Sequence, residues 1–299
     1  PDGIELIGNV CRHRQALMLR GRGNTQQHVV CPLHRWTYDL SGKLVGAPHF
    51  AQDPCLNLRN HPVQSWNGLL FEAHGLSGDE AVRAMLAGLR RSALPSGLIV
   101  CAMRHLSAVD TLRAAQLAIA WHGRGVVGFD LAGAEVGHPP GDHAQALAAA
   151  REAGLPLTLH AGEADAAERV LEAARMGATR IGHGVRLADA LADPARRGLV
   201  DEALQRGLHL EICPSSNVHT RAAASIAAHP ITALWQAGLS VGVNTDNRLM
   251  SRTSLSRELR LLRQHTVLTA DDLARMQLEA ARHSFLPAAD RERAAAAVQ

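Results

Sequence analysis

Short apolar segments alternate with longer alanine- and leucine-rich stretches from about residue 76 to the end of the chain. The stretches between them carry apolar residues at helical spacing and predict helices at Asp79–Arg91, Val109–His122, Asp142–Ala153 and Ala164–Met176. The apolar segments predict strands at Leu98–Cys101, Val126–Asp130, Pro156–His160, Thr179–His183, His209–Cys213 and Ser240–Asn244. Strand–helix repeats of this kind predict an α/β fold with a parallel sheet, most naturally a TIM-type βα barrel. Because such barrels close with eight strands and only about six are predicted, we expect an incomplete barrel.

The first 72 residues have a different character. They hold five of the nine aromatic residues but only three alanines, and asparagine, glycine and proline interrupt them often. The pattern predicts short strands at Ile4–Val10, Gln27–Cys31, Trp36–Tyr38 and Val63–Phe71, with a turn at 41–43. We therefore expect a small antiparallel β domain at residues 1–72, followed by the incomplete barrel at residues 73–299.

Composition excludes several classes of protein. The chain has 299 residues, of which 46% are hydrophobic and 20% charged, as in ordinary globular proteins. No apolar run reaches the roughly 18 residues of a membrane span, and no secretion leader opens the chain, so we expect a soluble, cytoplasmic protein. A net charge of +3 gives no argument for a nucleic-acid partner. Five cysteines, an odd number, argue against a disulfide framework.

Two short motifs near the start of the chain each offer one cysteine and one histidine. They are Cys11-Arg-His13 and Cys31-Pro-Leu-His34. Thiolates and imidazoles together favour zinc or an iron–sulfur centre. The spacing matches a Rieske [2Fe–2S] centre, in which the two cysteines bind one iron and the two histidines the other. A structural zinc knuckle is the alternative.

Most of residues 4–71 resemble the Rieske domain of ring-hydroxylating oxygenases. The resemblance extends from the two ligand motifs to Arg35–Gly46 and Trp66-Asn-Gly68, although Arg35 stands where these domains usually have glycine. It implies a cluster that passes single electrons and a reductase or ferredoxin that supplies them. Nothing after residue 72 resembles the mononuclear iron domain of those oxygenases.

Polar and ionisable residues follow the predicted strands of the barrel. The segments are Gly128–Glu135, Leu159–Glu163, Arg180–Gly184, Cys213–Asn217 and Asn244–Asn247. Barrels of this kind carry their chemistry at such strand ends. With these five motifs in this order, residues 76–299 resemble the adenosine deaminase family.

The resemblance implies a zinc-dependent hydrolytic deaminase of adenosine or a related aminopurine nucleoside. His160 and Asp246 would bind the zinc ion, and Asp246 would also contact the attacking water. Glu163 would protonate the purine ring as general acid, and His183 would orient or deprotonate the water.

Two further residues are implied in substrate binding. The backbone near Gly133 would meet the purine edge, and Asn247 would hydrogen-bond to the base in place of a second aspartate that is common in the family.

The family's first barrel strand carries a His-x-His pair that supplies two more zinc ligands, and no His-x-His occurs in this chain. Zinc affinity should therefore fall severely. Three interpretations follow from the sequence. The chain is a deaminase-type hydrolase that lacks its first two strands, an electron-transfer protein with a passive barrel remnant, or a fusion without a complete activity.

Overall fold

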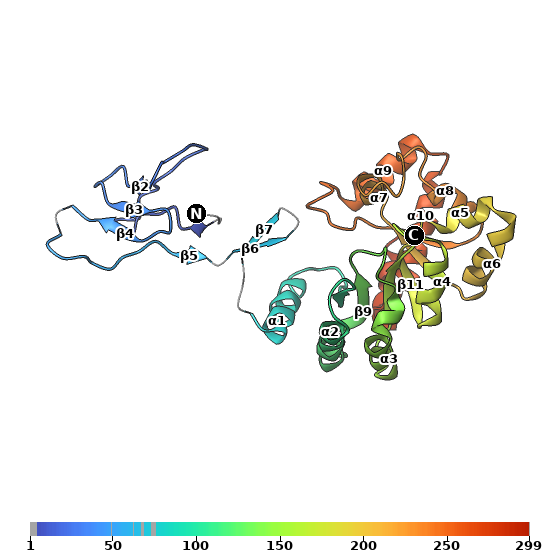
Figure 1. The fold of residues 1–299 in the computed structure, drawn as a ribbon. Helices are drawn as coiled ribbons and strands as arrows, with labels where there is room; N and C mark the ends of the chain where they lie inside the picture. The colour runs from blue at the N-terminus through green and yellow to red at the C-terminus, as the bar shows by residue number, and fades with distance from the viewer. Residues whose placement is uncertain (1–4, 49, 62, 67–68, 73–75, 299) are drawn as a thin grey trace. The chain divides into compact units, whose positions relative to one another are not determined.

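The computed structural model describes residues 5–48, 50–61, 63–66, 69–72 and 76–298 (Figure 1). The chain forms two compact units, Pro1–Ser77 and Gly78–Gln299. The boundary that we predict after residue 72 stays a prediction, because residues 73–75 lie outside the described ranges.

The first unit contains short antiparallel strands, as the sequence predicts. Strands β2 (His28–Val30), β3 (Thr37–Asp39) and β4 (Leu44–Gly46) form one sheet in that order. Strand β1 (Leu6–Ile7) pairs with β5 (Asn60–His61). The predicted strand Val63–Phe71 is instead a hairpin, in which β6 (Val63–Trp66) pairs with β7 (Leu69–Glu72). Asn67 and Gly68, which belong to the Rieske-like segment, lie outside the described residues.

The predicted turn at 41–43 is present, and its geometry explains its sequence. The Asp39 carboxylate accepts hydrogen bonds from the backbone N–H groups of Ser41 and Lys43, both at 2.9 Å. Gly42 has φ +85°, and a Cβ there would lie 3.2 Å from Leu58 Cβ, so both the backbone and the space favour glycine. The turn fixes the register of β3 against β4.

The second unit is built on six parallel strands, and all six lie where the apolar segments predict them. Their order in the sheet follows the chain without closure within residues 78–298, which confirms the incomplete barrel. The strands are β8 (Leu98–Met103), β9 (Val126–Ala132), β10 (Leu157–Ala161), β11 (Ala178–His183), β12 (His209–Ile212) and β13 (Ser240–Val243).

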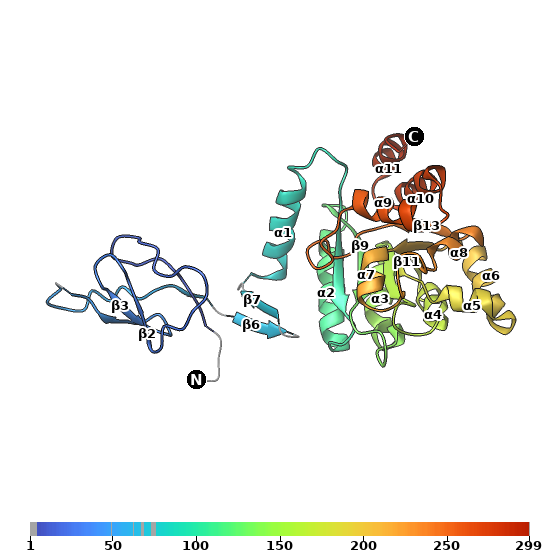
Figure 2. The same cartoon turned by 90° about the horizontal axis from the view of Figure 1, so that it is seen from above.

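Helices follow the strands and supply the outer layer of this unit (Figures 1 and 2). They are α1 (Gly78–Leu89), α2 (Ala108–Trp121), α3 (Ala144–Glu152), α4 (Glu168–Arg175), α5 (Leu187–Ala192), α6 (Arg197–Gln205), α7 (Pro214–His219), α8 (Ile231–Gln236), α9 (Leu255–His265), α10 (Ala270–His283) and α11 (Ala288–Ala296). No described helix is both long enough and apolar enough to cross a membrane.

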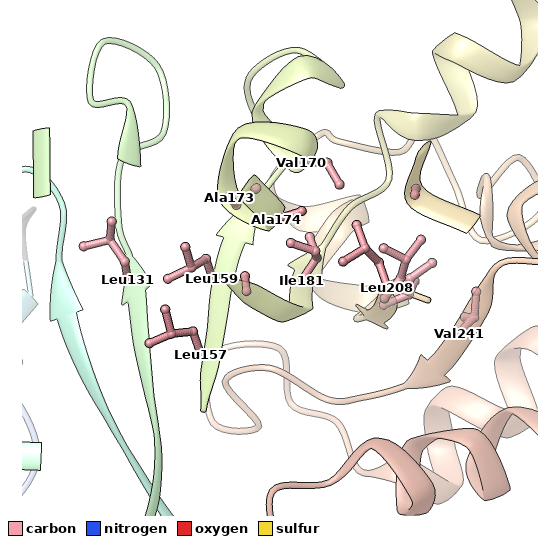
Figure 3. Packing of buried hydrophobic residues seen from close by; sticks show 14 of the residues in the cluster. Leu131, Leu157, Leu159, Val170, Ala173, Ala174, Ile181, Leu208 and Val241 are labelled. Carbon is pink, nitrogen blue, oxygen red and sulfur yellow. The ribbon is translucent and has the colours of Figure 1, made fainter. Parts of the chain in front are cut away.

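The core of the second unit lies between the sheet and its outer helices (Figure 3). Leu159 and Ile181 are fully buried on neighbouring strands and pack on the side where α4 contributes Val170 and Ala173. A fully buried leucine or isoleucine side chain contributes about 2 kcal/mol relative to exposure. Alternate residues of the same strands, including His160, point to the opposite face.

The helix α10 runs along the outermost strand β13. The side-chain amide of Gln277 donates to the backbone oxygen of Val243 at 3.2 Å, on the edge of the sheet that has no neighbouring strand. A Cβ at Gly242 would lie 2.8 Å from Ala280 Cβ, so glycine permits this close approach. The helix therefore covers an edge that would otherwise expose unpaired backbone groups.

The end of α10 continues onto the face of the sheet that carries His160. There the His283 ring stacks on the buried His209 ring with centroids 4.6 Å apart. The Phe285 ring lies against Gly128, and the Arg180 guanidinium carbon is 4.3 Å from its centre. In a closed barrel, side chains from all the strands fill this space. Here the C-terminal segment supplies part of the filling.

Candidate active site and candidate cluster site

The candidate catalytic residues of the second unit come together at the carboxyl ends of the strands. His160 lies in β10 and His183 is the last residue of β11, and their ring centroids are 5.1 Å apart. Asp246 follows β13 closely enough to act electrostatically on both histidines. His183 and Asp246 have φ values of +66° and +51°, which residues other than glycine rarely adopt. Such strained positions are typical of functional sites.

Glu163 and His183 share a hydrogen-bond network. One carboxylate oxygen of Glu163 lies 3.5 Å from His183 Nε2. The other accepts from Asn217 Nδ2 at 3.0 Å and from the Thr220 hydroxyl at 2.8 Å. Burial lowers the pKa of His183, although the charge of Glu163 opposes this effect. The network holds the Glu163 carboxylate in one orientation near the carboxyl end of β10.

His160 is oriented by a carboxylate behind it. Its Nδ1 lies 3.0 Å from Asp130, which leaves Nε2 without an intramolecular partner in the described structure. Burial alone would lower the pKa of His160, but the charge and hydrogen bond of Asp130 outweigh burial and raise it to about 9. A carboxylate on the second ring nitrogen is typical of metal-binding histidines. A metal ion would first have to displace the proton.

The described residues do not complete a zinc site. They contain no group of three or more His, Cys, Asp and Glu side chains that could hold one ion. Asp246 is also engaged, because the Ser216 hydroxyl donates to its Oδ2 at 2.6 Å. Catalytic zinc takes three protein ligands. Zinc binding by His160 and Asp246 stays a prediction, as does the weak affinity expected without a His-x-His pair.

The loop that carries Glu163 is held by Glu135. This buried carboxylate accepts hydrogen bonds from four successive backbone N–H groups, those of residues 162–165. The three longer bonds measure between 2.7 and 3.0 Å. Four hydrogen bonds to one side chain restrain all four backbone N–H groups at once. Glu135 thus fixes the backbone from which the Glu163 side chain projects.

The two residues implied in substrate binding lie near the same strand ends. Gly133 has φ +98°, and a Cβ there would lie 2.9 Å from His105 Nδ1, so only glycine fits. Asn247 is exposed, and its side-chain oxygen accepts from the Met250 backbone N–H at 3.1 Å. That bond gives Asn247 a role in the local turn. Contact of either residue with a purine stays a prediction.

In the first unit, the two ligand motifs form loops with the same hydrogen bonds. In each loop the cysteine N–H donates to a carbonyl five residues later, from Cys11 to Ala16 at 2.9 Å and from Cys31 to Trp36 at 2.7 Å. The residue four after each cysteine donates back to the cysteine carbonyl. That residue is Gln15 or Arg35, with φ +54° and +60°. The left-handed backbone at Arg35 explains why glycine would suit this position.

The four side chains of the two motifs converge. The thiols of Cys11 and Cys31 are both buried and share a hydrogen bond. The rings of His13 and His34 have centroids 4.7 Å apart, and Trp36 stacks on His13 at 4.7 Å. His13 Nδ1 is buried without a hydrogen-bond partner. A buried ring nitrogen without a hydrogen-bond partner destabilises the fold, and coordination of this nitrogen to iron would remove that cost.

The pKa shifts of Cys31 and His13 favour the protonation states that bind a metal. Burial raises the pKa of Cys31, but hydrogen bonds from the backbone N–H groups of Leu33 and His34 outweigh burial and lower it. Burial and the charges of His34 and Arg14 lower the pKa of His13. Thiolate and neutral imidazole are the forms that bind iron. The donor set therefore fits a [2Fe–2S] cluster, in which each iron needs only two protein ligands.

Several residues that make hydrogen bonds in the site could not be assigned a role from the sequence. Asp130, Glu135 and Asn217 lie within the deaminase-like motifs, but a motif does not show what a side chain contacts. Ser216 and Thr220 belong to α7 and the residue after it, and their partners lie about 30 and 57 positions away. His229 looks like a structural histidine in the sequence. Only the fold shows that it contacts Asn217.

Comparisons with known proteins agree with both resemblances. Residues 58–299 match the adenosine deaminase family and residues 2–66 match the Rieske [2Fe-2S] domain. The adenosine deaminase of Mycobacterium avium strain 104 is 43% identical over 232 residues, which cover 71% of this chain and 63% of that protein. That of Mycobacterium tuberculosis strain H37Rv is 42% identical over 228 residues, covering 71% and 62%.

Solved structures give the same result. The adenine deaminase of Arthrobacter aurescens superposes with a TM-score of 0.67 at 27% identity, covering 75% of this chain and 68% of that one. The N6-methyl-AMP deaminase of Arabidopsis thaliana gives a TM-score of 0.65 at 22% identity, covering 75% and 67%, and shows the fold alone.

The six-stranded parallel sheet, with imidazole and carboxylate groups at its strand ends, places the second unit in the βα-barrel class. Within that class, the chain belongs to the adenosine deaminase family. It spans 63% of the length of the M. avium relative.

Replacing Glu135 by alanine should loosen the loop at 162–165. We expect the free energy of unfolding to fall by about 3 kcal/mol, because four N–H groups lose a charged acceptor. Circular dichroism at 222 nm follows this loss, since the described helices belong to the second unit. Hydrogen exchange of amides 162–165 should accelerate. The exposed Glu152 serves as the control. Equal stability of Glu135→Ala and Glu152→Ala would contradict this role.

Proposed function

We propose that the second unit binds an aminopurine nucleoside and supplies the proton-transfer part of a hydrolytic deamination. The observation that carries this proposal is the placement of Glu163 beside His183, both held by Asn217 at the strand ends. Membership of the adenosine deaminase family supports the class of substrate.

In this proposal Glu163 is the general acid. It lies at a strand end, is partly buried, and its carboxylate is oriented by Asn217 and Thr220. A carboxylic acid in this position would protonate a ring nitrogen of the purine and make the neighbouring carbon more open to attack by water. His183 would orient that water. Gly133 and Asn247 would contact the base.

The zinc-dependent reaction that the family resemblance implies is the finer part of the proposal. When bound, zinc would supply a hydroxide at neutral pH. The candidate ligands in this chain are His160 and Asp246, and they do not complete the ion's shell. We therefore expect weak zinc binding and slow turnover of adenosine.

Replacing Glu163 by glutamine tests the acid. With excess zinc, adenosine-to-inosine turnover should fall roughly 100- to 10,000-fold, since a positioned general acid contributes about that much. Adenosine binding, measured by calorimetry, should persist in the variant. The exposed Glu168, paired with Arg196, gives the matched control Glu168→Gln. Turnover that survives in Glu163→Gln, or a wild-type chain that binds no adenosine, would contradict the proposal.

A second function is favoured by the convergence of the four cluster ligands and by the unpartnered His13 Nδ1. We propose that the first unit holds a [2Fe–2S] cluster that passes single electrons. His34 is exposed, so one edge of the site is open to a donor. A reductase or ferredoxin as that donor stays a prediction.

Iron content and electron paramagnetic resonance test the cluster. Anaerobically purified protein should contain about two irons per chain and, when reduced, give the spectrum of a cluster with mixed sulfur and nitrogen ligands. Cys31→Ser should lose the signal, and Cys55→Ser should keep it because Cys55 is exposed and away from the motifs. A colourless, iron-free protein after reconstitution, or iron retained in Cys31→Ser, would exclude this function.

A further inference from the structure

A chain of hydrogen bonds connects the backbone of α8 to His183. The backbone N–H of Ile231 donates to His229 Nδ1 at 3.1 Å. His229 Nε2 lies 3.3 Å from Asn217 Oδ1. Asn217 Nδ2 then lies 3.0 Å from both His183 Nδ1 and Glu163 Oε1. These contacts join three elements that are distant in sequence.

The donor and acceptor of each of these hydrogen bonds follow from the first one, between the Ile231 N–H and His229 Nδ1. A backbone N–H can only donate, so His229 Nδ1 must be the acceptor. A neutral imidazole carries one ring hydrogen, which places it on His229 Nε2. That hydrogen is donated to the oxygen of the Asn217 amide. The amide nitrogen is therefore the atom that faces His183, and it can only donate there.

The neutral state of His229 is secured by its surroundings. The side chain is only 4% exposed. Burial, together with the charge of His183, lowers the pKa of His229 to about 4. At neutral pH it therefore carries a single ring hydrogen, as the argument requires.

Glu163 fixes the Asn217 amide independently. A carboxyl oxygen that carries no proton can only accept a hydrogen bond, so the atom of Asn217 that faces Glu163 Oε1 is again the nitrogen. The contacts of Asn217 with His229 and with Glu163 therefore require the same orientation of the Asn217 amide. Asn217 is fully buried and His183 is 2% exposed, so water does not compete for these positions.

We propose that Asn217 and His229 are positioning residues that hold neutral His183 with its ring hydrogen on Nε2. This inference rests on the proposed deaminase-type site. The lone pair of His183 then lies on Nδ1 and is occupied by Asn217. His183 Nε2–H then points toward Glu163 Oε2, which lies 3.5 Å away. Of the two roles expected for His183, orienting the water is therefore favoured over deprotonating it.

The tautomer can be measured without substrate or metal. Two-bond 1H–15N correlation spectra of the full chain, labelled with 15N-histidine, distinguish a protonated ring nitrogen from a bare one. The His183 signals are assigned by their absence in His183→Asn. We expect Nε2–H and bare Nδ1 for both His183 and His229 at pH 7.5.

Asn217→Leu removes the donor while keeping a side chain of the same branched shape and number of heavy atoms. His183 should then lose its single tautomer and show a mixture. Thr220→Val is the matched control, because it removes a hydrogen bond to Glu163 but leaves the contact between Asn217 and His183. Its His183 signals should match the wild type. Melting followed by circular dichroism checks that the variants fold.

A hydrogen on His183 Nδ1 in the wild-type chain would overturn the inference, and this result needs no variant. An unchanged Nε2–H tautomer in folded Asn217→Leu would overturn it as well. Failure of the chain to bind adenosine would instead count against the proposed function and would leave the tautomer assignment standing. The two failures are therefore distinguishable.

Discussion

The contact between the Glu135 carboxylate and the loop at 162–165 is the one on which the site of the second unit depends. Parallel strands bring their carboxyl ends to one edge of a sheet, but they do not by themselves orient the side chains that follow. One buried charge receiving four N–H groups fixes that loop. From there Glu163 reaches Asn217, and Asn217 reaches His183. These hydrogen bonds thus fix the relative positions of Glu163, Asn217 and His183.

The open sheet places a second constraint on the unit. Parallel sheets normally have both faces covered, because their strands are apolar on both sides. The outer face packs on helices such as α4, and α10 lies along the edge strand β13. Phe285 and His283 then occupy part of the inner face. This arrangement buries much of the sheet without closure, although Cys101 on the edge strand β8 is exposed, and it leaves the carboxyl ends of the strands available for chemistry.

The sequence predicts the framework of this chain well. All six strands of the second unit were expected from their apolar segments, since each is bounded by helical stretches of a different period. The spacing of the two Cys/His motifs also predicted four candidate ligands, and their side chains lie together in the structure. Their binding of a cluster stays a prediction. The hairpin β6–β7 was wrongly predicted as one strand, because the prediction did not count the Asn67-Gly68 pair, which is typical of tight hairpin turns, as an interruption.

Other features of the site could not be predicted from the sequence. The roles of Asn217 and His229 arise from contacts between residues 12 to 54 positions apart, and no local pattern records them. The coverage by α10 likewise follows from packing.

We propose that one imidazole and one carboxylate, from His160 and Asp246, form the metal-binding part of the deaminase-type site. X-ray absorption at the zinc edge, with the cluster site first filled with iron and sulfide, measures the ligands of the bound zinc. We predict a zinc shell of one imidazole and oxygen ligands, without sulfur, in which the imidazole is lost in His160→Ala. A shell with two or more imidazoles, or one that His160→Ala leaves unchanged, would show that His160 and Asp246 do not form this site.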